Sequence, residues 1–152
     1  MKPQKIESFK IDHNKLVPGI YVSRTDGDIV TYDLRTRKPN SGDYMDNATM
    51  HSVEHMIATY IRSSSISEDV IYFGPMGCQT GFYLLVRNGD NLEVLNVLKQ
   101  TLKEVIDHEG EVFGASGIEC GNYRNLDIEL AKKECSRYLD VLNGYTPDFK
   151  YK

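Results

Sequence analysis

The five residues from His51 to His55 have the composition of a metal-binding motif on a helix. They read His-Ser-Val-Glu-His, and side chains four positions apart face the same side of a helix, so both imidazoles could bind one divalent ion. At about 100° per residue, Glu54 falls roughly 60° from His51, next to the two rings. The pattern predicts a two-histidine metal site with a carboxylate beside it. On these five residues alone, a solvated helix face that carries two histidines stays open as an alternative.

The opposite face of the same predicted helix is apolar. On an arc of roughly 140° to 280° from His51 lie the side chains of Met50, Val53, Met56, Ile57, Tyr60 and Ile61. Asp46 or Asn47 is a suitable N-cap, and the helix should end near Arg62. One face would therefore pack on a core while the other displays the two histidines and the carboxylate.

A catalytic metal site needs three protein ligands and one open position, so the third ligand must come from elsewhere in the chain. Cys120 is the best candidate, because Gly117 and Gly121 would let its backbone and thiolate approach an ion closely. Glu54 stands between the two histidines and is better placed as a general base over the open position.

Cys78 is a second residue that could do chemistry. Gly77 and Gly81 flank it in a loop between two strand-like runs, and a thiol close to a cation ionises more readily. It could act as a nucleophile or as an acid and base. It could also be a fourth ligand that closes the metal site into a structural one.

The elements that must position these residues indicate an α+β fold. Alternating and short apolar runs divided by turn residues predict four strands, at about 20–24, 29–35, 70–73 and 82–86. Helical periodicity predicts two further helices, at about 91–107 and 126–142, the first with a capping box at its start. Strand pairs that alternate with helices predict an antiparallel sheet with helices packed on one face. We expect residues 1–152 to form one domain.

Several other reactive side chains have simpler interpretations. Arg35 lies on the strand face opposite the apolar side chains, where it could be a solvated arginine or an anion clamp. Ser8 and His13 lie in an N-terminal arm that reads as irregular and polar. Cys135 falls on the apolar stripe of the last helix, and His108 lies near the end of the preceding one, so both are expected to be structural.

The composition excludes some classes of protein. Hydrophobic residues make up 40% of the 152 residues and charged residues 26%, as in ordinary globular proteins. A formal net charge of −4 without a basic run argues against a nucleic-acid partner. No apolar run could span a bilayer and no signal-peptide pattern is present. Three cysteines without a framework spacing fit a reducing compartment, so we expect a cytoplasmic protein.

Taken in order along the chain, five groups of residues resemble the S-ribosylhomocysteine lyase (LuxS) family. The resemblance covers nearly the whole chain and is far more specific than any single motif. The groups are Glu7-Ser8-Phe9 with Asp12-His13-Asn14, Asp33-Leu34-Arg35 with Pro39-Asn40, His51 to His55, Pro75-Met76-Gly77-Cys78-Gln79-Thr80-Gly81, and Cys120-Gly121.

The resemblance implies a carbon–sulfur lyase with a LuxS-like fold. The family cleaves S-ribosylhomocysteine to homocysteine and 4,5-dihydroxy-2,3-pentanedione, the precursor of the quorum-sensing signal autoinducer-2, and the same step recycles a by-product of the activated methyl cycle. The substrate's carbonyl migrates from C1 to C3, and β-elimination then releases the C5 thiolate. Family members are homodimers with two active sites at the subunit interface.

The resemblance also implies which residues hold the metal and which carry out proton transfer. His51, His55 and Cys120 match the family's three ligands for one divalent ion per subunit, natively ferrous iron, with zinc or cobalt as alternatives. Glu54 and Cys78 match its two acid and base residues.

Four further residues match the family's substrate-binding positions. Ser8, His13 and Arg35 match residues that line the substrate pocket, and Arg62 matches an arginine near the homocysteine end. The chain departs from the family pattern at Tyr72, where many members carry an acidic residue six positions before the loop cysteine, and this puts in doubt any substrate contact expected there.

The metal-binding motif is also compatible with two other functions. A metalloprotease of the pitrilysin type uses the same five-residue motif and would need a carboxylate ligand such as Glu129 or Glu134. A metal-binding or sensor module without activity would use Cys78 to complete a four-ligand shell.

Overall fold

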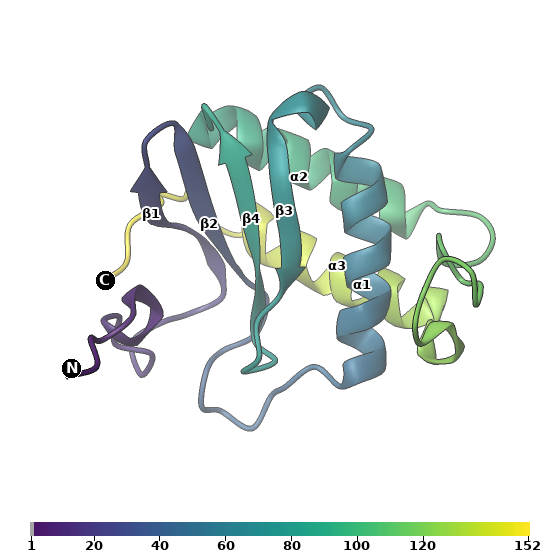
Figure 1. Ribbon diagram of the computed structural model, residues 1–152, viewed down its shortest axis with the longest axis horizontal. Helices are drawn as coiled ribbons and strands as arrows, with labels where there is room; N and C mark the ends of the chain where they lie inside the picture. The colour runs from purple at the N-terminus through teal and green to yellow at the C-terminus, as the bar shows by residue number, and fades with distance from the viewer. Residues whose placement is uncertain (1) are drawn as a thin grey trace.

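The computed structural model describes residues 2–152, and in this range the chain forms one antiparallel sheet covered by three α-helices (Figure 1). The strands are β1 (Gly19–Asp26), β2 (Ile29–Arg35), β3 (Val70–Pro75) and β4 (Gly81–Arg87), and the helices are α1 (Asn47–Ile61), α2 (Asn91–Ile106) and α3 (Ile128–Asn143). The strand order is β1-β2-β4-β3. In Figure 1, α2 and α3 lie behind the sheet and α1 stands beside β3. The predicted α+β fold with one covered face is therefore confirmed.

Helix α1 begins and ends where the sequence predicts. Asp46 is the N-cap, and its side chain accepts a hydrogen bond of 2.7 Å from the backbone N–H of Thr49. Arg62 is the C-cap. The helix buries Val53, Met56, Ile57 and Ile61 against the rest of the core. His51, Glu54 and His55 lie on the other side and are only half-buried.

Several element boundaries differ by one to a few residues from those predicted, and the clearest differences have a local cause. Helix α3 begins at Ile128 because Asp127 caps it, accepting from the backbone N–H of Glu129, while Leu126 is still extended. Strand β3 continues to Pro75 through pairing with β4, although a glycine and a proline had suggested an earlier end. Helix α2 ends at Ile106, and its predicted cap Asp90 is confirmed.

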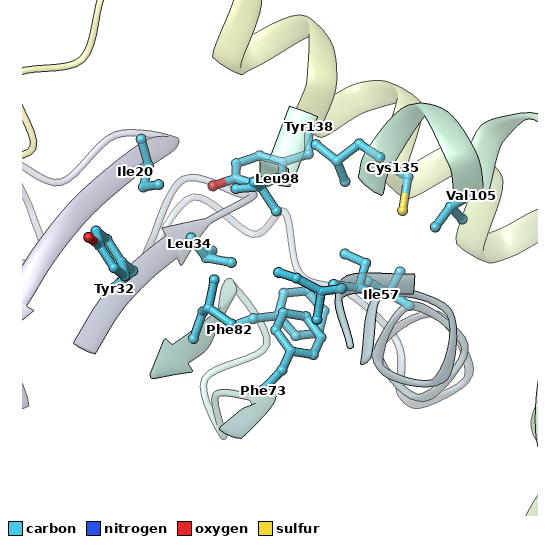
Figure 2. Packing of buried hydrophobic residues seen from close by; sticks show 14 of the residues in the cluster. Ile20, Tyr32, Leu34, Ile57, Phe73, Phe82, Leu98, Val105, Cys135 and Tyr138 are labelled. Carbon is cyan, nitrogen blue, oxygen red and sulfur yellow. The ribbon is translucent and has the colours of Figure 1, made fainter. Parts of the chain in front are cut away.

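The core lies between the sheet and the three helices. Figure 2 shows side chains of the sheet, among them Leu34, Phe73 and Phe82, converging with Ile57 of α1, Leu98 and Val105 of α2, and Cys135 and Tyr138 of α3. Cys135 is thus the buried apolar side chain that its stripe predicted. Gly81 lets β4 approach β2, since a Cβ there would lie 2.6 Å from the carbonyl oxygen of Leu34.

The second face of the sheet is covered near β1 and β2 by the segment that follows α3. The carbonyl of Phe149 accepts a hydrogen bond of 2.8 Å from the N–H of Val22, and the Tyr151 ring stacks on Tyr21 with centroids 5.0 Å apart. Asp33 and Arg35 are consequently 0% and 1% exposed, although they lie on the face away from the main core. Within residues 2–152, no helix has the length and apolar character needed to cross a membrane.

Candidate metal centre and substrate pocket

His51, His55 and Cys120 form a cluster of potential metal ligands. One ligand atom from each residue lies within 4.8 Å of the others, and the Sγ atom of Cys120 is 3.3 Å from Nε2 of His51. In tetrahedral zinc sites, bond lengths of about 2.3 Å to sulfur and 2.0 Å to nitrogen put these two atoms about 3.5 Å apart. The sequence prediction that a distant thiol joins the two histidines is therefore consistent with the geometry.

The ring of His51 is oriented by hydrogen bonds that involve two asparagine side chains. Its Nδ1 lies 2.6 Å from Oδ1 of Asn125, in the short helical turn η3 (Tyr123–Asn125). The side-chain amide of Asn125 in turn donates to Oδ1 of Asn47 at 2.6 Å, at the start of α1. Since Oδ1 of Asn125 is an acceptor, His51 carries its proton on Nδ1 and leaves the Nε2 lone pair facing Cys120.

The ring of His55 is oriented by backbone. Its Nδ1 donates to the carbonyl oxygen of Phe113 at 2.7 Å, so His55 also has its lone pair on Nε2. The next residue, Gly114, has a φ of +72°, and a Cβ there would lie 3.1 Å from Nδ1 of His55. The close approach of this loop to the metal cluster thus requires a glycine at position 114. It does not require one at Gly117 or Gly121, neither of which has a left-handed φ.

This donor set fits a divalent transition metal. Two neutral imidazoles and one thiolate are ligands that zinc, ferrous iron and cobalt accept. Both imidazoles present an unprotonated nitrogen, and both protonated nitrogens have a hydrogen-bond acceptor. The loop thiol is further held by the backbone N–H of Asn122, 3.4 Å from its sulfur.

Glu54 lies beside the metal cluster, in a pocket of about 250 Å³ that it lines together with His51, Met50, Asn122 and Pro75. It is half-buried and lies on the same face of α1 as the histidines. It is not a member of the three-residue cluster. Its side chain therefore lines the same pocket as the candidate ligand His51, and its role as a general base stays a prediction.

Cys78 lies in a second pocket, of about 410 Å³, which meets the first at Pro75. The thiol is exposed. Its sulfur lies 3.0 Å from Oγ1 of Thr80 and accepts a hydrogen bond of 3.7 Å from the Arg35 guanidinium. Among residues 2–152, Cys78 does not join the group of clustered ligands, which speaks against a closed four-ligand shell. A cation, the Arg35 guanidinium, therefore lies beside this thiol.

Arg35 is held in place by groups of its own chain. Its Nε and Nη2 donate to the two carboxylate oxygens of Asp33 at 3.1 and 2.6 Å, and its Nη1 donates to Thr80 at 2.8 Å. It is therefore neither of the two forms expected from the strand pattern alone, a solvated arginine or a free anion clamp. It is a buried cation that lines the Cys78 pocket.

The N-terminal arm supplies the rest of this pocket. Ser8, Phe9 and His13 line it opposite Cys78 and Tyr83. Ser8 and Phe9 belong to a short helical turn, η1 (Glu7–Phe9), and the His13 ring is fixed by a contact of 3.0 Å between its Nδ1 and the Ile11 carbonyl. The structure thus brings together three of the four residues that the family resemblance assigns to substrate.

The fourth residue, Arg62, lines neither pocket in the described part of the chain. It lies at the end of α1, where its guanidinium is directed to the carbonyls of Val70 and Ile71 at 3.5 and 3.4 Å.

Tyr72, the position at which the chain departs from the family pattern, is 49% exposed on β3. Its ring lies over Gly74, where a Cβ would overlap the Tyr72 hydroxyl, next to the proline shared by the two pockets.

The carboxylates required by a pitrilysin-type protease are not at the metal cluster. Glu134 is buried and forms an ion pair with Arg37 at 2.6 Å. Glu129 is exposed in the first turn of α3, and the cluster found among residues 2–152 contains neither. The third member of the cluster is the thiol of Cys120, whereas a pitrilysin-type protease would need a carboxylate there.

Sequence reasoning missed the residues that orient the site. Asn125 and Asn47 could not be paired from sequence, because 78 positions separate them and asparagine is common in turns. The roles of Asp33 and Tyr151 were also missed, although a charged pair on one strand face is a usable signal for Asp33.

The chain is similar to known proteins along most of its length. The family model described as S-Ribosylhomocysteinase (LuxS) matches residues 6–146. S-ribosylhomocysteine lyase of Finegoldia magna is 45% identical over 145 residues, which cover 92% of each chain. The protein of that name from Phocaeicola vulgatus is 44% identical over 96% of this chain and 95% of the relative. The one from Borrelia garinii is 42% identical over 93% and 94%.

Proposed function

Since this chain belongs to the S-ribosylhomocysteinase (LuxS) family of lyases, we propose that it cleaves S-ribosylhomocysteine to homocysteine and 4,5-dihydroxy-2,3-pentanedione. The observation that carries the proposal is the convergence of His51, His55 and Cys120 beside a pocket that holds a second, exposed thiol. A metalloprotease would not need that thiol, and a closed metal-binding module would not leave it outside the ligand cluster.

The metal is held, in this proposal, by His51, His55 and Cys120, with one ion per subunit. A divalent cation there would supply a Lewis acid that polarises the sugar's carbonyl and adjacent hydroxyl. Ferrous iron is the ion we expect natively, and the mixed nitrogen and sulfur donors also suit zinc and cobalt.

Glu54 and Cys78 carry out the proton transfers. Carbonyl migration from C1 to C3 requires a base to remove a proton from one sugar carbon and an acid to return it to the neighbouring one. The two residues occupy adjoining pockets that meet at Pro75, so a substrate that spans both would lie between them. The Arg35 cation, 3.7 Å from the Cys78 sulfur, would stabilise negative charge that develops on the thiol. Loss of the C4 proton then expels the C5 thiolate.

Substrate binding is assigned to the pocket around Cys78. Ser8 and His13 present a hydroxyl and an imidazole to it, and both groups can hydrogen-bond sugar hydroxyls. Arg35 lines the same pocket but is held by Asp33 and Thr80, so its effect on substrate would be mainly electrostatic. Arg62 would contact the homocysteine end only if substrate extends beyond the two pockets.

The working form is proposed to be a cytoplasmic homodimer with its active sites at the subunit interface, each subunit being one lyase domain of residues 1–152. Phe9, at the mouth of the Cys78 pocket, is 64% exposed, and Tyr72 near the other pocket is 49% exposed. Large apolar side chains at the rim of a site are suited to burial by a second subunit.

The decisive experiment is a direct assay. The protein, loaded anaerobically with ferrous iron, is incubated with S-ribosylhomocysteine, and the released homocysteine thiol is titrated. We expect the protein to release many moles of thiol per mole of chain. Release should stop when the metal is removed and return when the metal is restored. No thiol release by the metal-loaded protein would contradict the proposed function.

A further inference from the structure

Asp33 is a buried carboxylate that receives hydrogen bonds from two directions. Arg35 donates to both of its oxygens, with Nη2 at 2.6 Å from Oδ2 and Nε at 3.1 Å from Oδ1. From the other side, the hydroxyl of Tyr151 donates to Oδ2 at 2.7 Å. The side chain of Asp33 is 0% exposed, so its orientation depends on these donors and not on water.

The arginine that Asp33 holds points its remaining guanidinium nitrogen at the Cys78 pocket. Nη1 of Arg35 donates to Thr80 at 2.8 Å and to the Cys78 sulfur at 3.7 Å. Arg35 is 1% exposed, so solvent screens this charge weakly. A continuous series of contacts therefore joins Tyr151 through Asp33 and Arg35 to the thiol.

Tyr151 is suited to remain a donor in this series. Its ring stacks on Tyr21 with an interplanar angle of 17°, which fixes the direction of its hydroxyl. Burial and the neighbouring Asp33 carboxylate raise the pKa of Tyr151 far above its ordinary value, so the hydroxyl keeps its proton at neutral pH. Tyr151 also lies beyond residues 6–146, the part of the chain that the family model matches.

We infer that Asp33 and Tyr151 are positioning residues for the reaction, which act on Cys78 through Arg35. The hydroxyl of Tyr151 offsets part of the negative charge of Asp33. Without it, that charge would act more fully on Arg35 and lower the positive potential at the sulfur, and the carboxylate would lose one of the two donors on Oδ2. The inference rests on the proposed role of Cys78 in turnover.

The test is the reactivity of Cys78 in the Tyr151→Phe variant of the full-length protein. This substitution keeps the ring that stacks on Tyr21 and removes the hydroxyl only. Alkylation by iodoacetamide at pH 7 is followed by mass spectrometry of the peptide that contains Cys78. We expect a rate about threefold to tenfold lower than in the wild type, as for loss of one typical hydrogen bond. We expect kcat for S-ribosylhomocysteine to fall by a similar factor while KM changes less than about twofold.

Tyr145→Phe is the matched control. The hydroxyl of Tyr145 belongs to the same segment and accepts a hydrogen bond of 2.9 Å from the backbone N–H of Ile20, but it has no contact with Asp33. Its loss should leave Cys78 alkylation and kcat unchanged. The alkylation of Cys135, which is 1% exposed in the core, is measured in the same digest, because faster labelling there would report a general loosening of the fold.

The possible results separate the inference from its alternatives. Wild-type alkylation of Cys78 in Tyr151→Phe would overturn it, and so would equal slowing in Tyr145→Phe or slowing accompanied by faster labelling of Cys135. Alkylation needs no substrate, so a protein that fails to cleave S-ribosylhomocysteine but shows the slowed Cys78 reaction would refute the proposed function and leave the link from Tyr151 to Cys78 standing.

Discussion

At the scale of single residues, the two histidines are held by partners of different kinds. His51 depends on the side chain of Asn125, whereas His55 depends on the backbone carbonyl of Phe113. Both arrangements place the proton on Nδ1 and free Nε2 for a ligand bond. A mutation can remove the first partner directly, but the second can be altered only by displacing the loop that carries Phe113.

The proposed acid and base residues lie outside this set of ligands, and this separates metal binding from turnover. Cys78→Ala and Glu54→Gln should each retain one divalent ion per chain, because neither residue is in the ligand cluster. Each should lose about 10² to 10⁴-fold in kcat, the usual contribution of a positioned acid or base.

Metal content by mass spectrometry and thiol release, measured on the same sample, check this prediction. Cys120→Ala is the comparison variant, and it should lose the ion as well as turnover. An ion lost from the Cys78 or Glu54 variant, or turnover retained in it, would contradict the assigned roles.

At the scale of elements, the sequence predicted what depends on local periodicity. The spacing of His51 and His55, the apolar stripe around Val53 and the cap at Asp46 all follow from one helix, so α1 could be predicted to within a residue. The sheet and its covered face followed from alternation in β2 and from the short apolar runs of β3 and β4.

The rest of the site depends on contacts between distant segments, which periodicity does not encode. Alternation placed Arg35 on the face opposite the core, and this was correct. It could not show that Tyr151 covers that face and leaves Arg35 1% exposed. The sequence also could not show which loop glycine is needed. Gly117 and Gly121 flank the candidate ligand in sequence, but the residue with a left-handed φ in this loop is Gly114.

Gly114 allows the loop that carries Phe113 to lie close to His55 of α1. Gly114→Ala should therefore weaken metal binding. The residue has a φ of +72°, and the added Cβ would lie 3.1 Å from Nδ1 of His55. Left-handed backbone costs alanine about 1 kcal/mol, and displacement of the Phe113 carbonyl should lower metal affinity about tenfold or more.

Gly110→Ala is the matched control for this variant. Gly110 also has a positive φ, of +101°, but no atom lies within 4 Å of the Cβ that alanine would add. It should lose stability and keep its metal affinity. Competition with a chromophoric chelator measures the affinity, and urea unfolding of the metal-free protein measures the stability. Equal metal affinities for the two variants would show that Gly114 has no special relation to His55.

The cap of α1 gives a prediction with a defined pH dependence. Hydrogen bonds from the side chain and backbone N–H of Thr49 lower the pKa of Asp46 below its ordinary value of 3.8. A carboxyl whose pKa is lower in the folded state stabilises the fold above its unfolded pKa and loses that effect as pH falls through the folded pKa. Asp46→Ala should therefore cost about 1 kcal/mol at pH 7, and the difference from wild type should shrink below about pH 4.

Urea unfolding of the metal-free protein between pH 3 and pH 7 measures this difference. Asp90→Ala, which removes the corresponding cap of α2, serves as the comparison and should show a similar cost at pH 7. A penalty for Asp46→Ala that stays constant down to pH 3 would exclude a contribution from the carboxylate charge.

At the scale of the whole molecule, the candidate site lies between α1, the loop after β3 and the N-terminal arm. The two pockets meet at Pro75; Phe9, which lines the larger one, and Tyr72, three residues before Pro75, are both exposed. A substrate with a polar sugar and a thioether would remain largely accessible to water in one chain. A second subunit that covers the region would exclude water from the proton transfers.

This reasoning predicts that Phe9→Asp converts a dimer into a monomer. Phe9 is 64% exposed and lines the Cys78 pocket. A carboxylate there would have to be desolvated at the interface, at a cost that outweighs the packing it replaces.

Leu92→Asp is the matched control, since Leu92 is 66% exposed in the first turn of α2, away from both pockets. Sedimentation equilibrium should give the mass of two chains for the wild type and for Leu92→Asp, and the mass of one chain for Phe9→Asp. Because the monomer would leave its pocket open, thiol release by Phe9→Asp should fall well below that of the wild type and of Leu92→Asp. A wild-type protein that sediments as a single chain and is fully active would contradict the shared site.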